Sequence, residues 1–287
     1  MYKILHKEVL SEAVKLFIVE AALVASKARA GQFVIVRVDE TGERIPLTIA
    51  DFNASEGTIT LIFQEVGKST MQMGTLEVGE GFEDVVGPLG HATEIENYGK
   101  IILCAGGVGI APMFPIARAL KQAGNQIITI LGARTRSLLF WEERMRAYSD
   151  EVIICTDDCS YGRGGVVTEP LKELLEKYND IARVWAIGPG VMMKFVSKTT
   201  RPFNIPTIVS LNTIMVDGTG MCGGCRVVMD DGAQFVCVDG PEFDGHRVDW
   251  DNMMSRLAFY REDEKLSIER WKEHQSNMDK AINEASR

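Results

Sequence analysis

The chain has 287 residues, of which 46% are hydrophobic and 25% are charged. A chain of this length forms about two domains and can bury substantial cores. Its formal net charge of −9 argues against nucleic acid and anionic membranes as nonspecific binding partners.

Residues 1–96 predict a small antiparallel β-barrel. Short β-rich runs, among them KLFIVEA, QFVIVRV and TITLIFQEV, alternate with glycine-containing turns, and we expect a short helix near Ser69. The N-terminal stretch MYKILHKEVLSEAVKL carries charges throughout and has no apolar signal core. We therefore expect a soluble, cytoplasmic protein.

Residues 97–210 predict a doubly wound domain with a parallel sheet. The apolar runs IILCA, IITIL, VIICT, VWAI and TIVSL alternate with helical segments such as PIARALKQA and EPLKELLEKY, which is typical of parallel strands buried on both faces. The uncharged stretch 101–117 contains three glycines and two prolines. It therefore predicts a strand, a turn and a helix start rather than a membrane span.

The last two segments differ from the rest in composition. Residues 211–247 are rich in glycine, aspartate and cysteine. Residues 248–287 are polar and helix-prone, and they predict a helical tail that is either exposed or docked on a partner.

Two glycine turns in the predicted α/β domain indicate a nucleotide site. In CAGGVGIAP, Gly106, Gly107 and Gly109 connect a strand to a helix, where the backbone can approach a pyrophosphate closely. This turn lacks the third glycine and the later acidic residue of the G-x-G-x-x-G pattern, and a packing role alone is the alternative. The second turn, AIGPG at 186–190, ends the fourth strand, so both turns can face one crevice beyond the strand ends.

Arg134 and Arg136 follow the second strand of the same domain. By the general rule for these folds, arginines here favour the 2′-phosphate of NADP. Solvated charges at a helix entry are the alternative.

Two motifs in the predicted barrel admit both a structural and a phosphate-binding interpretation. In VGKST, 66–70, either Ser69 or Thr70 could cap a helix, or the same donors could hold a flavin pyrophosphate. RIPLT, 44–48, sets an arginine beside an edge proline and is ambiguous in isolation.

The run DGTGMCGGCRVVMDDGAQFVC has the spacing of an iron–sulfur site with one cysteine replaced. Four residues separate Asp217 from Cys222, two separate Cys222 from Cys225, and eleven separate Cys225 from Cys237. A cysteine at 217 would open the run as C-x4-C-x2-C, the plant-type spacing, and a carboxylate is a competent anionic donor in its place. Two alternatives stay open: the four residues bind zinc, or Asp217 is a turn residue and the fourth ligand lies elsewhere.

Taken in chain order, these motifs resemble the ferredoxin–NADP reductase superfamily. RIPLT, GKST, GPLG, GGVGIAP, LGARTRSLLFW, TDDCSYGRGG, IGPGVMM and the cysteine run occur in that family's order and cover roughly residues 1–255. Within the superfamily the chain is similar to the electron-transfer subunits of dihydroorotate dehydrogenase. It is more similar still to the small subunits of electron-bifurcating NADH-dependent reduced ferredoxin:NADP oxidoreductases.

The resemblance implies an antiparallel Greek-key FAD barrel (1–96), a doubly wound NAD-binding domain (97–210), a [2Fe–2S] domain (211–247) and a C-terminal helical tail (248–287). It places Thr48 beside flavin N5 as the candidate catalytic residue. The family usually has arginine three residues before this position; here Ile45 stands there, with Arg44 one residue earlier. The positions expected to contact FAD are Arg44, Ile45, Pro46, Leu47, Thr48, Ile62, Phe63, Gln64, Gly67, Ser69 and Thr70.

Relatives with an arginine near position 134 use NADH, so the resemblance favours NAD(H) over NADP. The positions that it implies for the nucleotide are Gly106, Gly107, Gly109, Pro112, Arg134, Gly188, Pro189 and Met192. The ligands that it implies for a [2Fe–2S] cluster are Asp217, Cys222, Cys225 and Cys237.

The implied activity is hydride exchange between NAD(H) and FAD, with single electrons passing through the cluster to or from a larger subunit. That partner would carry flavin and iron–sulfur groups and use NADP(H) and ferredoxin; nucleic acid and membranes are not expected as partners. Two other functions stay open. One is the electron-transfer subunit of a dihydroorotate dehydrogenase or glutamate synthase type complex, and the other is a zinc-bearing nucleotide-binding regulator.

Overall fold

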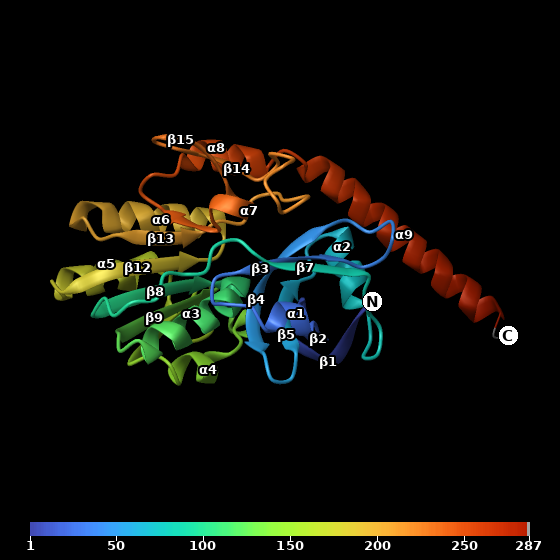
Figure 1. Cartoon of the computed structure of the whole chain (residues 1–287), viewed down its shortest axis with the longest axis horizontal. Helices are drawn as coiled ribbons and strands as arrows, with labels where there is room; N and C mark the ends of the chain where they lie inside the picture. The colour runs from blue at the N-terminus through green and yellow to red at the C-terminus, as the bar shows by residue number, and fades with distance from the viewer. Residues whose placement is uncertain (286–287) are drawn as a thin grey trace.

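The computed structural model describes residues 1–285, which form two seven-stranded sheets and one two-stranded sheet. The small sheet lies on the far side of the second large sheet from helix α4 (Glu142–Arg146) (Figure 1). The predicted fold class, with an antiparallel barrel, a doubly wound domain and a small cluster segment, is confirmed.

The first sheet is antiparallel, in the order β6-β1-β2-β5-β4-β3-β7. Alternate residues of its strands enclose one core, where the Phe17 and Phe63 rings meet edge-on with centroids 5.1 Å apart. The short helix expected near Ser69 begins at Lys68. The elements are β1 (Tyr2–Ser11), β2 (Val14–Glu20), α1 (Ala22–Ala25), β3 (Phe33–Arg37), β4 (Ile45–Asn53), β5 (Thr58–Gln64), α2 (Lys68–Gly74), β6 (Gly81–Phe82) and β7 (Asp84–Leu89).

The second sheet runs β11-β10-β9-β8-β12-β13-β16, and its strands are parallel except for β16. Ile102 and Cys104 of β8 pack with α5 and α6, while Ile101 and Leu103 pack with α3 and α4. Because helices cover both faces, the strands are apolar throughout. The elements are β8 (Lys100–Gly106), η1 (Gly107–Gly109), α3 (Ile110–Gln122), β9 (Gln126–Ala133), η2 (Arg136–Leu138), α4 (Glu142–Arg146), β10 (Glu151–Thr156), β11 (Arg163–Gly164), α5 (Thr168–Lys177), β12 (Ile181–Ile187), α6 (Gly190–Thr200), η3 (Arg201–Phe203) and β13 (Thr207–Ser210).

The strand order of this sheet reverses between β8 and β12. In doubly wound sheets, ligands bind at such a reversal, outside the carboxyl ends of the strands. Strand β8 ends at Gly106 and β12 ends at Ile187, so each strand leads directly into one of the two predicted glycine turns.

The cysteine-rich segment contains β14 (Arg226–Met229), β15 (Gly232–Phe235), α7 (Val236–Asp239) and β16 (Glu242–Asp244). Strands β14 and β15 form the small hairpin sheet. Strand β16 instead pairs antiparallel with β13, with Phe243 opposite Val209. The segment expected as a separate cluster domain therefore supplies an edge strand to the nucleotide domain.

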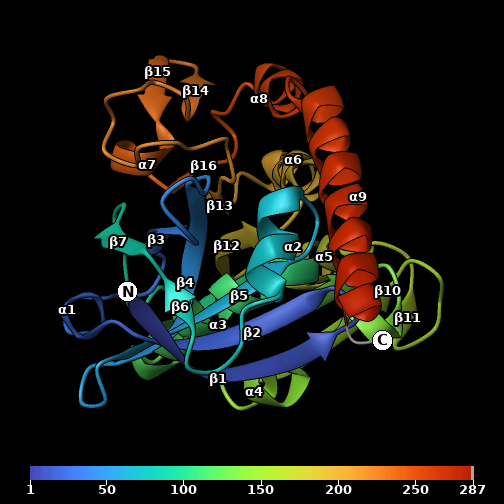
Figure 2. The same cartoon turned by 90° about the vertical axis from the view of Figure 1, so that its right-hand side faces the viewer.

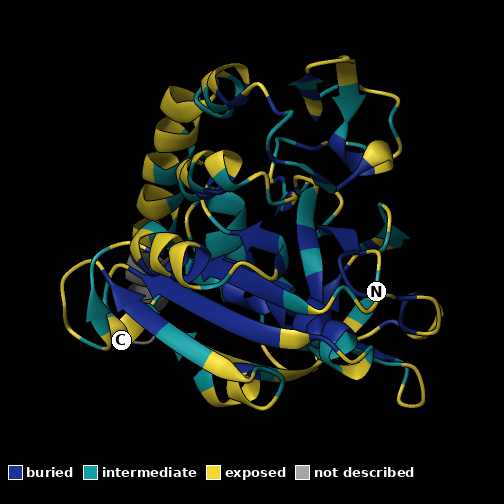
Figure 3. Ribbon diagram, turned by 90° about the vertical axis from the view of Figure 1, so that its left-hand side faces the viewer, coloured by how far each residue is buried: buried dark blue, intermediate teal, exposed yellow. Residues whose placement is uncertain are grey.

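The tail forms α8 (Trp250–Leu257) and α9 (Arg261–Ala285). Helix α9 leaves the cluster segment and runs back along α2 of the first sheet (Figure 2). Through residue 277, its outward side is largely exposed (Figure 3). The tail thus docks on its own barrel. Among the residues that the structure describes, no helix is both long and apolar enough to cross a bilayer.

Candidate electron-transfer site

The four predicted cluster ligands meet in two pairs. The Cys222 Sγ donates a hydrogen bond to Asp217 Oδ1 at 3.0 Å, and the sulfurs of Cys225 and Cys237 lie 3.2 Å apart. The charge of Asp217 reaches the second pair, since it contributes to raising the pKa of Cys237. The structure thus forms the two pairs, and their joining as one set of four cluster ligands stays a prediction.

Local backbone geometry brings the first pair together. Gly218, Gly220 and Gly223 adopt φ angles of 76°, 84° and 67°, which side chains with a Cβ rarely adopt. The resulting tight loop lets Asp217 Oδ2 accept from the Met221 amide at 2.9 Å. Hydrogen bonds, first that from the Cys222 thiol, hold the pKa of Asp217 well below its usual range. The carboxylate is thus ionised and able to act as an anionic ligand.

The sulfurs also accept hydrogen bonds from the backbone. The Gly224 amide lies 3.4 Å from the Cys222 sulfur, and the Cys237 amide lies 3.4 Å from the Cys225 sulfur. Such bonds stabilise negative charge on metal-bound thiolates. Burial raises the pKa of Cys237 to about 12, so a bound metal would be needed to deprotonate this thiol.

The two-by-two arrangement fits a binuclear cluster better than a single metal ion. Among the side chains that the structure describes, no three His, Cys, Asp or Glu lie close enough together to hold a metal, so the two pairs alone carry the comparison. A [2Fe–2S] cluster takes two protein ligands at each iron, and each pair found here matches one iron. The pairing therefore favours the cluster over the zinc alternative.

The two glycine turns touch one another at the strand reversal. A Cβ on Gly106 would lie 2.3 Å from the Met192 sulfur, and a Cβ on Gly188 would lie 3.0 Å from the Gly106 carbonyl oxygen. At Gly107, with φ 55°, a Cβ would meet no heavy atom within 4 Å, so its backbone borders open space. This open, glycine-lined edge fits the phosphates of a nicotinamide nucleotide.

The remaining nucleotide candidates surround this edge. Pro189 immediately precedes α6, and its ring would contact a Cβ on Gly106 at 3.3 Å. Pro112 is the third residue of α3, near the start of the helix. Arg134 is exposed directly after β9, on the same carboxyl edge of the sheet. The structure thus brings the two turns together and places the arginine one strand away.

The expected flavin residues divide between two faces of the barrel because strand side chains alternate. Ile45, Leu47 and Phe63 point into the barrel core, so only their backbones can contact a flavin. Ile62 belongs instead to the core shared with α3 of the nucleotide domain. By the same alternation, Pro46 and Thr48 lie on the face of β4 that points away from the barrel core. Gln64 lies on the same face of β5 as Ile62. Arg44 precedes β4 and is exposed.

The outward face of β5 meets the nucleotide turn. Strand β5 contacts the η1 turn, and α3 packs along β4. An ion pair of 2.7 Å between Arg118 of α3 and Asp51 of β4 fixes this contact. The surface that carries Ile62 is therefore next to Gly107–Gly109, which would bring a flavin and a nicotinamide together.

The Thr70 hydroxyl caps α2. Its Oγ1 accepts hydrogen bonds from the amides of Val66 and Gly67, both at 3.0 Å, and the Ser69 hydroxyl donates to the Glu43 carboxylate. A Cβ on Gly67 would meet no heavy atom within 4 Å. The capping interpretation therefore describes the Thr70 side chain, while the backbone beside it stays open to a ligand.

A buried carboxyl that no sequence pattern indicated lies where the three parts of the chain meet. Glu242 of β16 accepts a hydrogen bond of 2.7 Å from the Thr93 hydroxyl, in the link between the two large sheets. Burial raises the pKa of Glu242 to about 7, and the positive charge of Arg183 opposes this rise. This side chain joins the cluster segment to the barrel link.

Two family models match the chain. A model for the iron–sulfur cluster binding domain of dihydroorotate dehydrogenase B matches residues 212–249, and a model for the oxidoreductase NAD-binding domain matches residues 103–198. These ranges contain the paired ligands and both glycine turns.

Relatives match over nearly the whole length. The dihydroorotate dehydrogenase B (NAD(+)) electron transfer subunit homolog of Thermotoga maritima is 50% identical over 270 residues, which cover 94% of this chain and 95% of that one. A probable electron transfer subunit of the same enzyme from Methanocaldococcus jannaschii is 35% identical, covering 84% and 89%.

Solved structures share the fold. The structure of the NADH-dependent reduced ferredoxin–NADP oxidoreductase, described for flavin-based electron bifurcation, has 47% identity and a TM-score of 0.90, and the match covers 94% of this chain and 98% of that one. Phthalate dioxygenase reductase, at 18% identity and a TM-score of 0.58, shares the fold alone.

Proposed function

Because the chain belongs to the family of iron–sulfur flavoprotein electron-transfer subunits that includes those of dihydroorotate dehydrogenase B, we propose that it is the small subunit of an electron-bifurcating oxidoreductase. It exchanges hydride with NAD(H) on FAD and passes single electrons through a [2Fe–2S] cluster. The observation that carries this proposal is the pairing of Asp217 with Cys222 and of Cys225 with Cys237.

The residues of the chain bind and orient the groups that react. The turns at Gly106 and Gly188 hold the phosphates and the nicotinamide side of the nucleotide, and the outward face of Thr48 and Ile62 lies next to them. Holding two rings in contact removes most of the entropic barrier to hydride transfer. When bound, flavin supplies the conversion between two-electron and one-electron transfer.

The cluster ligands connect this site to the surface. Cys225 and Cys237 are buried, whereas Cys222 is exposed. The apolar side chain of Met221, the residue before Cys222, is 88% exposed, and that of Val216, the residue before Asp217, is 54% exposed. Exposed apolar side chains that gather at one place mark protein interfaces, so this surface is the proposed contact for a larger subunit that uses NADP(H) and ferredoxin.

An electron-transfer subunit of a dihydroorotate dehydrogenase complex is the second candidate. The names of the Thermotoga maritima and Methanocaldococcus jannaschii relatives favour it. The aspartate at 217 departs from the usual set of four thiolates, and the resemblance found in the sequence associates such an aspartate with the small bifurcating subunits. Anaerobic co-purification separates the two candidates: the first requires a partner that oxidises or reduces NADP(H) and ferredoxin, the second one that oxidises dihydroorotate.

Iron analysis of ligand variants tests the cluster itself. We expect about two irons per unaltered chain, almost none in Asp217→Ala, and near-normal iron in Asp217→Cys, which restores a fourth thiolate. Cys159→Ala removes an exposed cysteine outside the two pairs and serves as the matched control. Unchanged iron in Asp217→Ala, or zinc in place of iron in the unaltered chain, would contradict the proposal.

A further inference from the structure

A cavity of about 380 Å³ lies between α2 and α9. Sites for small molecules typically enclose about 300–1,000 Å³, so the cavity suits a ligand fragment of moderate size. It is open to solvent, and Gly67, the neighbour of the lining residue Lys68, also borders open space. The residues that line it are Lys68, Asp263, Leu266, Ser267, Arg270, Trp271 and His274.

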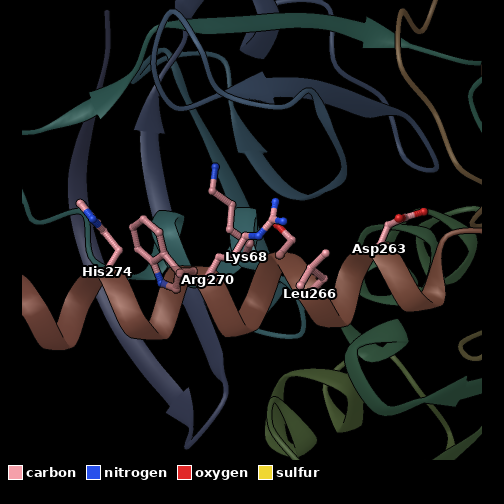
Figure 4. A pocket seen from close by; sticks show the side chains of 7 residues that line it. Lys68, Asp263, Leu266, Arg270 and His274 are labelled. Atoms are coloured by element: carbon pink, nitrogen blue, oxygen red, sulfur yellow. The ribbon is translucent and has the colours of Figure 1, made fainter.

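One face of α9 supplies all but one of these residues. Positions 263, 266, 267, 270, 271 and 274 are spaced by three or four residues or adjoin one another, which places them along a single helical stripe. Figure 4 shows Asp263, Leu266, Arg270 and His274 projecting from the helix on the side that Lys68 faces. The tail therefore forms one wall of the cavity and α2 forms the other.

The lining combines cations with one large aromatic ring. The Lys68 ammonium lies 6.0 Å from the centre of the Trp271 ring, and Arg270 is the neighbouring residue on the helix. Lysine and arginine are the usual partners of phosphate groups. An indole next to them offers a flat apolar face, on which a nucleobase can stack. Asp263, near the start of α9, adds a carboxylate that can accept hydrogen bonds from hydroxyl groups.

We propose that this cavity binds the adenosine diphosphate end of the flavin, with Trp271 as the aromatic partner of adenine and Lys68 and Arg270 as partners of the phosphates. The inference rests on the proposed function, in which the barrel binds FAD. It assigns a binding role to the C-terminal helix. It also makes this helix the element that selects FAD over FMN, because FMN has no adenosine.

Flavin binding measures this role without any turnover. The full chain is purified anaerobically, freed of flavin, and titrated with FAD and separately with FMN while flavin fluorescence is followed. We expect Trp271→Leu and Arg270→Gln each to weaken FAD binding about tenfold, the usual order for the loss of one stacking or charge-assisted contact. FMN binding should change less than twofold in Trp271→Leu, because FMN has no adenine to stack on the indole.

Lys272→Gln is the matched control, because it removes one exposed positive charge from α9 at a position that does not line the cavity. Equal FAD affinity in Arg270→Gln, Trp271→Leu and Lys272→Gln would overturn the inference. Equal losses for FAD and FMN in Trp271→Leu would also overturn it, because the helix would then act on the barrel rather than on adenine. If the unaltered chain bound neither flavin, the proposed function would fail together with the inference.

Discussion

Glu242→Gln should change how the stability of the protein depends on pH. Burial raises the pKa of Glu242 to about 7, against about 4.3 for an unfolded glutamate. The folded protein therefore holds this proton more tightly than the unfolded chain. The free energy of unfolding falls as pH rises between these two values and is constant above about 7. The amide of glutamine cannot ionise, so the free energy of unfolding of the variant does not fall in this way.

The magnitude follows from the two pKa values. At about 1.4 kcal/mol per pH unit, ionising Glu242 lowers the free energy of unfolding by about 2 kcal/mol between pH 5.5 and 7. For a chain of this size that corresponds to roughly 3 °C in Tm. The glutamine oxygen can still accept the Thr93 hydrogen bond. The stability of the variant relative to the unaltered chain should therefore rise by this free energy between pH 5.5 and 8.

The assay is the thermal midpoint of both proteins from pH 5.5 to 8, followed by circular dichroism under anaerobic conditions. The difference between the two midpoints matters, because other titrating groups contribute equally to both. Glu83→Gln removes one exposed carboxylate of the barrel sheet and is the control. A difference that stays constant across this range would refute the reasoning, and so would a difference that shrinks with pH, which would mark Glu242 as a stabilising carboxylate.

Two further predictions concern the nucleotide and partner surfaces. Gly109→Ala should abolish NADH binding, measured by quenching of flavin fluorescence, and should lower Tm. The added Cβ would lie 2.3 Å from the Ile187 carbonyl oxygen, and such overpacking costs about 1–3 kcal/mol. Normal NADH affinity in this variant would contradict the turn assignment. Met221→Glu should reduce recovery of the partner subunit about tenfold or more in anaerobic co-purification. Val9→Glu, at a residue 58% exposed on β1, should leave that recovery unchanged, and equal losses would contradict the interface.

Spacing along the sequence predicted what depends on local geometry. The interval from Asp217 to Cys222 is closed by one glycine-rich loop, so its 3.0 Å contact follows from the sequence. The turns at Gly106 and Gly188 could be placed together because parallel strands end at a common edge of the sheet. Both predictions needed only short-range geometry and one topological rule.

The parts that sequence did not predict depend on pairings between distant segments. Strand β16 has three residues and no pattern of its own. It is held by β13 and by a hydrogen bond of 2.9 Å from the Leu211 amide to the Pro241 carbonyl. The docking of α9 on α2 likewise joins segments from opposite ends of the chain. The spacing of Arg270, Trp271 and His274 indicates one helical face, but such a pattern does not identify the surface on which that face packs.

The tail docking also has a consequence for biosynthesis. Lys68 and Trp271, on opposite walls of the cavity, are separated by about 200 residues of chain. At a translation rate of about 5–20 residues per second, roughly 10–40 s pass between the appearance of the first and of the second. During that interval the cavity lacks the wall that α9 provides. Every proposed ligand of the iron–sulfur cluster is translated before the wall can close, so the order of the chain makes this cavity one of the last parts of the protein to be completed.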